Sequence, residues 1–146
     1  SQNSTEDSAK ILGEAKLVDS TSDASEDQTD GYFETAVINR ERSRGEALQT
    51  LQVVVDSSET MPDVKDKALS EMMQIATDIE TEANVEEMIK AKGFEDCLAI
   101  ISGENINVIV KSPGLLTAEV AQISEIVKNE TGFPIENIRI VEKKDI

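Results

Sequence analysis

The chain has 146 residues, 30 of them acidic and 14 basic, which gives a formal net charge of −16 at pH 7. This charge disfavours nucleic acid and anionic membranes as partners, because proteins bind both mainly through lysine and arginine. There is no histidine and Cys97 is the single cysteine, so the usual base near neutral pH and the usual zinc ligand sets are missing. We therefore predict a protein without enzymatic activity that uses no metal and no cofactor.

Carboxylate pairs such as Glu86 and Glu87 are expected in so acidic a chain and fall in no calcium-loop pattern, so we interpret them as surface charges. No stretch of about 18 consecutive apolar residues is present, so the sequence itself predicts no transmembrane helix. Cys97 begins an apolar segment with no cation beside it, and we expect its thiol to be buried and unreactive.

Residues 1–31 are rich in Ser, Thr, Asp, Glu and Gln and contain no aromatic residue. Such a segment buries too little apolar area to offset the conformational entropy lost on folding. We predict that it is a disordered acidic linker. Within it, the spaced apolar residues of 9–18 are compatible only with a transient amphipathic turn.

Residues 32–83 predict a helical region made of two long helices. Apolar residues recur near helical spacing over 32–55, and Asp56 with the two serines after it ends this first helix. Pro62 is typical of a first helical turn and starts the second helix. There, apolar residues recur every three or four positions until about Glu82.

The pattern of apolar and turn residues over 84–146 predicts a module in the order helix, strand, strand, helix, strand. Asn84 is the expected N-cap of a short helix over residues 85–91, which stops before Gly93. A second helix is expected between Thr117, as its N-cap, and Gly132. Alternating or continuous apolar runs place the three strands at 97–101, 105–111 and around 138–140.

The first of these strands is apolar on both faces, which is typical of a central strand. We therefore predict the sheet order second–first–third, with a hairpin between the first two strands and a helical crossover that makes the third parallel to the second. Val120, Ile123 and Val127 are the expected buried face of the crossover helix. The predicted fold class is α+β: long helices followed by an αββαβ module, whose three-stranded sheet is covered on one face by helices.

The order and spacing of these segments resemble the stage III sporulation protein AH family of endospore-forming bacteria. The likeness covers residues 32–146, and its last module is similar to the ring-building modules of type III secretion basal bodies and the flagellar membrane ring. It is carried by the stretches 84–96, 103–111 and 137–141, the aromatic pair Tyr32 and Phe33, and a helix with Arg40, Arg42 and Arg44.

The resemblance implies an assembly role between two membranes. Members of the family have one N-terminal transmembrane helix, so a single-pass anchor in the mother-cell membrane is expected upstream of residue 1. The folded part is then expected to face the space between mother cell and forespore. The implied partner is stage II sporulation protein Q from the forespore, with which the chain is expected to build a homo-oligomeric, channel-like ring.

Two features are candidate partner-binding sites. The second strand, placed at a sheet edge, carries a charge only at Lys111, so it is either an edge wetted by solvent or a place where a partner adds a strand. The strand-addition residues are Asn105, Ile106, Asn107, Val108, Ile109 and Val110. Arg40 and Arg44 share one helix face, and they either pair with Glu41, Glu46 or the second helix or dock onto an acidic or carbonyl-rich partner.

Two classes of function remain open from the residues alone. The first is a ring-assembly and protein-interaction domain, and the alternative is a monomeric periplasmic-type binding domain for a peptide or small ligand. A nucleic-acid module with the same strand and helix order would need a basic GXXG loop, which the sequence lacks.

Overall fold

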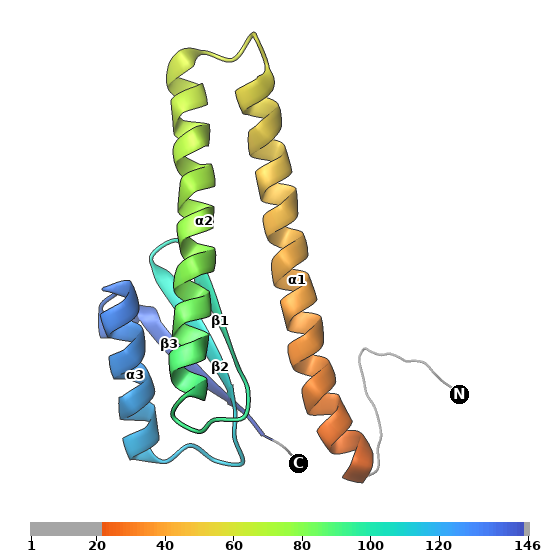
Figure 1. Cartoon of the computed structure of the whole chain (residues 1–146), viewed down its shortest axis with the longest axis vertical. Helices are drawn as coiled ribbons and strands as arrows, with labels where there is room; N and C mark the ends of the chain where they lie inside the picture. Colours follow the sequence, from red (N-terminus) through yellow and green to blue (C-terminus); the bar gives the residue numbers. More distant parts are fainter. Residues whose placement is uncertain (1–21, 145–146) are drawn as a thin grey trace.

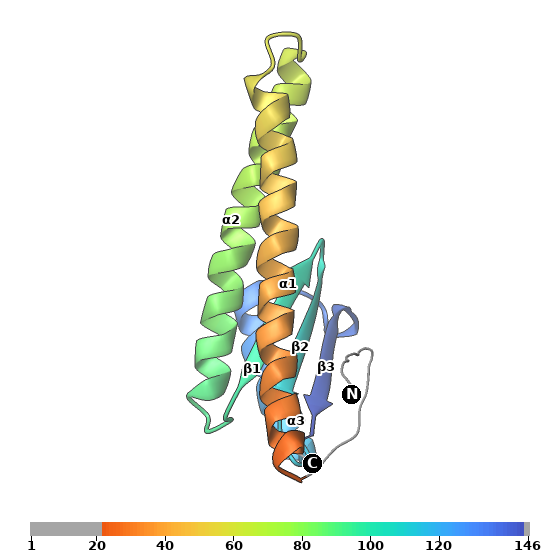
Figure 2. The same ribbon diagram turned by 90° about the vertical axis from the view of Figure 1, so that its right-hand side faces the viewer.

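The computed structural model describes the backbone of residues 22–144 and the side chains from Gly31 onward. Two long helices form an antiparallel hairpin whose lower half packs on a three-stranded sheet, while its upper half extends beyond the sheet (Figures 1 and 2). The predicted α+β class is confirmed. In chain order the elements are α1 (Ser22–Asp56), α2 (Pro62–Lys90), β1 (Cys97–Ser102), β2 (Asn105–Lys111), α3 (Thr117–Thr131), a 3₁₀ turn (Ile135–Asn137) and β3 (Ile138–Lys143).

α1 begins ten residues earlier than the sequence pattern predicts. Residues 22–31 are helical, so assigning them to a disordered linker was wrong, and the remainder of that segment, residues 1–21, lies outside the described residues. The acidic composition that suggested a linker also suits the start of a helix, because carboxylates near a helix N-terminus interact favourably with its dipole.

α2 is one continuous helix, so the predicted break after Glu82 and the separate helix over residues 85–91 were wrong. Asn84 lies in the middle of α2 and caps nothing. The reason is a single buried stripe in which Ala68, Glu82, Val85 and Ile89 follow each other at helical spacing. Through this stripe α2 packs first on α1 and then on the sheet. The predicted domain boundary between residues 83 and 84 therefore lies inside one helix.

The sheet has the order β1–β2–β3, so β2 is central and the predicted order second–first–third was wrong. β1 pairs with β2 antiparallel and β2 pairs with β3 parallel, as predicted. β1 is apolar on both faces because helices lie on both sides of it. α2 and α3 cover one face, and α1 covers part of the other, where Phe33 packs against Leu98 and Ile109.

The main core lies between the sheet and the helices α2 and α3, as predicted. Ile123 and Val127 are buried there, but Val120 is 37% exposed and Ile126 takes the third buried position. Thr117 is the first residue of α3 and does not cap it; instead, the Glu119 carboxylate accepts a hydrogen bond from the Leu116 N–H. Gly132 ends α3 as predicted, with the positive φ that favours glycine.

Candidate protein-interaction site at the sheet edges

β2, the predicted docking strand, has a neighbouring strand on each side. Every residue of it is in register with β1, β3 or both, so its backbone offers no free ladder to a partner. The side chains of Ile106, Val108, Ile109 and Val110 are buried, and only Asn105 and Asn107 are exposed. Strand addition along β2 was therefore a wrong prediction, and the edges of the sheet are β1 and β3.

The edge formed by β1 is occupied by side chains from both long helices. The Ala99 N–H donates to the Glu86 carboxylate at 2.9 Å, and the Ile101 N–H donates to the Glu82 carboxylate at 2.7 Å. The Ala99 carbonyl accepts a hydrogen bond from the Arg40 guanidinium at 2.7 Å. These groups face away from β2, so the carboxylates and the guanidinium take the place of a fourth strand.

The same residues form a compact ion-pair network. Arg40 lies 2.8 Å from the Glu86 carboxylate and 3.4 Å from that of Glu82, and Arg44 is hydrogen-bonded to Glu82. Glu82 is only 1% exposed. Pairing of Arg40 and Arg44 with the second helix, one of the alternatives left open by the sequence, is thus confirmed, whereas their docking onto a partner stays a prediction.

Glu82 and Glu86 are the two residues of this network that the sequence did not single out. The sequence does contain a pattern that points to them. Glu82 and Glu86 are four residues apart on α2, as Arg40 and Arg44 are on α1, and two such pairs can face each other in an antiparallel helical hairpin. Among so many glutamates, however, only the burial of Val85 and Ile89 on the same helix face distinguishes this pair from the solvated ones.

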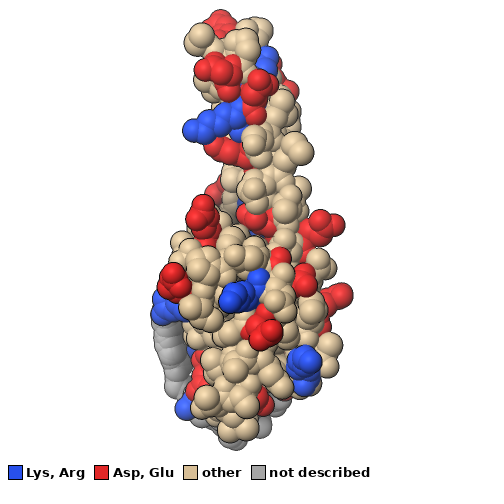
Figure 3. Space-filling view, turned by 90° about the vertical axis from the view of Figure 1, so that its left-hand side faces the viewer, with Lys and Arg blue, Asp and Glu red and all other residues tan. Residues whose placement is uncertain are grey.

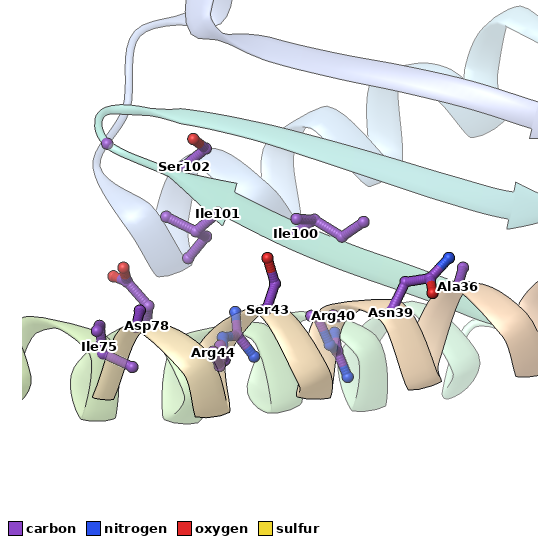
Figure 4. A pocket seen from close by; sticks show the side chains of 12 residues that line it. Ala36, Asn39, Arg40, Ser43, Arg44, Ile75, Asp78, Ile100, Ile101 and Ser102 are labelled. Atoms are coloured by element: carbon purple, nitrogen blue, oxygen red, sulfur yellow. The ribbon is translucent and has the colours of Figure 1, made fainter. Parts of the chain in front are cut away.

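A cavity of about 580 Å³ lies beside this network, between α1, α2 and the end of β1. In Figure 4, Ile100 and Ser102 of β1 lie opposite Asn39 and Ser43 of α1 across it. This is the candidate site for the alternative function, the binding of a peptide or small ligand. Its two cations, however, are already engaged with the glutamates of α2.

Cys97, the first residue of β1, is buried as predicted. Burial, with smaller contributions from Glu86 and Asp96, raises the pKa of its thiol to about 12, while Lys90 acts in the opposite direction. The Sγ atom lies 3.5 Å from the Glu86 carbonyl oxygen, to which the thiol donates. A thiol held in this protonated form is a poor nucleophile and a poor metal ligand. Within residues 31–144 no group of three or more acidic or cysteine side chains is placed to hold a metal ion.

β3 forms the opposite edge of the sheet, at the margin seen in Figure 2. The carbonyl of Lys143 accepts a hydrogen bond from the Ser112 N–H, on the β2 side. Because backbone groups alternate in direction along a strand, Val141 also faces β2, and Ile140 directs its N–H and C=O outward. In the part of the chain that is described, no hydrogen bond reaches these outward groups of Ile140.

On the face seen in Figure 3, acidic and basic side chains are scattered and neither kind gathers into one patch. No helix within residues 22–144 has the length and apolar character required to cross a bilayer.

Residues 22–144 form an α+β module in which side chains of a helical hairpin are hydrogen-bonded to one edge of a small sheet, whereas no described residue does the same at the outward groups of Ile140 on the other edge. The chain belongs to the SpoIIIAH-like protein family, whose model matches residues 1–140. It is similar to stage III sporulation protein AH of Bacillus subtilis (strain 168), with 28% identity over 125 residues that make up 86% of this chain and 55% of that protein. The chain thus spans about half the length of this relative.

One solved structure shares the fold. A chain of the structure described as the SpoIIQ–SpoIIIAH pore-forming complex matches with a TM-score of 0.68 and 24% identity, covering 78% of this chain and 96% of that one. The type III secretion system protein EscJ of enteropathogenic E. coli shows a looser likeness, with a TM-score of 0.47 and 25% identity over 52% of each chain.

Proposed function

We propose that this chain is a non-catalytic assembly module of sporulation that binds SpoIIQ and takes part in a ring or pore between two membranes. Membership in the SpoIIIAH-like family carries the proposal, together with the fold shared with the SpoIIQ–SpoIIIAH complex. We propose, as the family resemblance implies, that the chain lies at the interface of mother cell and forespore, with its folded part facing the forespore.

The open edge of β3 is the docking site that the geometry supports best. β2 is central, and three outward groups of β1, the N–H groups of Ala99 and Ile101 and the carbonyl of Ala99, are hydrogen-bonded to the network of Glu82, Glu86 and Arg40. A partner strand would have to displace these bonds at β1, which favours pairing with β3. Strand addition obtains its affinity from main-chain hydrogen bonds, which suits an edge whose apolar side chains, those of Ile138, Ile140 and Val141, are half-buried against the module's own core.

A proline on β3 tests this docking site. Ile140→Pro and Ile140→Ala both remove the isoleucine side chain that packs on the core, but only the proline also removes the outward-facing N–H. We expect Ile140→Pro to bind the soluble part of SpoIIQ at least about tenfold more weakly than Ile140→Ala, as measured by calorimetric titration. Circular dichroism checks that both variants are folded.

The comparison has a clear negative outcome. If the two variants are folded and have equal affinity for SpoIIQ, the partner does not pair with β3. If neither they nor the parent chain binds SpoIIQ under any condition, the proposed partnership itself is wrong.

A further inference from the structure

We propose that the four charged residues Arg40, Arg44, Glu82 and Glu86 form an edge lock that prevents a second copy of this chain from pairing with β1. The sheet has two edges, and in a chain with both of them open β3 of one copy can pair with β1 of the next. Such a contact joins two different surfaces, so it repeats from copy to copy and gives an open-ended filament unless the rotation between copies closes a ring. The lock leaves the sheet with β3 alone for pairing.

The geometry of the network is that of a substitute strand. Two carboxylate oxygens accept hydrogen bonds from the N–H groups of Ala99 and Ile101, at 2.9 and 2.7 Å, two residues apart along β1. A guanidinium donates to the carbonyl of Ala99 at 2.7 Å. A neighbouring strand would make its ladder contacts with these same groups.

The network is built into the fold and is not a surface contact. The side chain of Glu82 is 1% exposed, and those of Arg40, Arg44 and Glu86 are 12%, 14% and 16% exposed. Burying four charged groups costs free energy, which ion pairs of this kind often fail to offset compared with apolar packing. Stability of the hairpin alone would therefore be served as well by apolar residues, but these would cover the edge of β1 and leave its N–H groups without an acceptor.

Hydrogen exchange of individual backbone amides in the parent chain gives the first test. Amides on the outer side of an unprotected edge strand exchange quickly, whereas hydrogen-bonded ones are protected. We expect the amides of Ala99 and Ile101 to be protected to a degree similar to those of Leu98 and Ile100, which face β2. Fast exchange at Ala99 and Ile101 would overturn the lock without any variant being made.

Paired apolar replacements give the second test, because they remove the lock without leaving a charge unpaired. In Arg44→Met/Glu82→Met the Ile101 N–H loses its acceptor, and we expect its exchange to become about 10- to 100-fold faster. The matched control is Arg42→Met/Glu87→Met, a pair of exposed residues on the same two helices. We expect no change at Ile101 in that control.

Measurements of self-association test whether the network keeps a second copy of the chain from pairing with β1. With both charged pairs replaced by methionine, sedimentation velocity should show concentration-dependent association at concentrations where the parent and the control remain unassociated. If the fourfold variant does not fold, the double variant Arg44→Met/Glu82→Met is compared with the parent and the control in the same sedimentation experiment. In the exchange experiment, Glu82→Gln should keep Ile101 protected, unlike Glu82→Ala, because its amide oxygen still accepts a hydrogen bond.

Each outcome decides one part of the inference. Unchanged exchange at Ile101 after loss of its acceptor shows that β1 is not held by the network. Faster exchange without association shows that the network satisfies the edge but does not exclude a second copy. None of these measurements involves SpoIIQ, so they stand or fall apart from the proposed function.

Discussion

The strands β1 and β3 are both six residues long and both lie at a margin of the same sheet, yet their outward backbone groups have different surroundings. β1 faces the helical hairpin, and its outer N–H groups are bound by buried carboxylates. Apart from its pairing with β2, β3 is joined to α1 by more exposed contacts, such as that between Lys143 and Tyr32. The difference indicates that the long hairpin has two roles: it covers part of the sheet and it determines which edge remains available.

Removing one member of the buried network on the β1 side should produce the largest loss in the free energy of unfolding. Glu82→Ala leaves Arg44 without its carboxylate and the Ile101 N–H without its acceptor. We expect a loss of about 3–5 kcal/mol in the free energy of unfolding, measured with urea, because a buried charge loses its partner. The exposed neighbour Glu87→Ala is the control, and equal effects of the two substitutions would contradict a structural role for Glu82.

The reactivity of Cys97 reports on the closed state of the β1 side. Its thiol pKa of about 12, against an ordinary value of 9.0, lowers the thiolate fraction near pH 7.5 by about 1,000-fold. We expect alkylation of the folded chain to be slower than that of the urea-unfolded chain by at least this factor, with the native rate still rising above pH 9. A native rate within tenfold of the unfolded rate would show that β1 opens readily.

Phe33 anchors α1 on the face of the sheet opposite to α2 and α3. It is 4% exposed and packs against Leu98 and Ile109. We expect Phe33→Ala to lower the free energy of unfolding by about 3 kcal/mol through lost burial and the cavity left behind. Ile38→Ala, which affects an exposed residue on the same helix, should change it by less than about 0.5 kcal/mol.

The elements whose identity depends on local pattern were predictable, and those that depend on partners far along the chain were not. The alternation of Ile106, Val108 and Val110 located β2, and Gly132 marked the end of α3. The position of β2 in the sheet was missed because apolar residues on both faces of a strand have two physical causes, a central position or a helix on each side. The second cause applies to β1, since α1 supplies Phe33 from 65 residues earlier than Leu98.

The interaction site was predictable only in part, for a related reason. Arg40 and Arg44 stood out as a basic island, and their spacing on one helix face was correct. Their partners Glu82 and Glu86 look like ordinary surface glutamates in an acidic sequence, and only the hairpin brings the four together. Whether a strand lies at an accessible edge is likewise a property of the assembled sheet, and it cannot be inferred from the sequence of that strand alone.

The contact between Lys143 and Tyr32 should give the smallest effect and offers the sharpest comparison with the buried network. The Lys143 Nζ atom lies 4.6 Å from the centre of the Tyr32 ring, whose residue is 39% exposed. A cation over an exposed aromatic ring contributes about 0.5–1 kcal/mol. A double-mutant cycle with Tyr32→Leu and Lys143→Gln should return a coupling energy of this size, and Tyr32→Phe should preserve it because the ring remains.

The equivalent cycle on Arg44 and Glu82 should give a coupling several times larger, because that pair is buried and hydrogen-bonded. Such a ratio is what the structure requires if α1 is fixed to the β1 side and only loosely joined to β3. A coupling above about 2 kcal/mol between Lys143 and Tyr32, or one as small as theirs between Arg44 and Glu82, would mean that the hairpin holds both edges equally. In that case β3 would not be a more accessible edge than β1, since a partner strand would have to displace an equally strong contact.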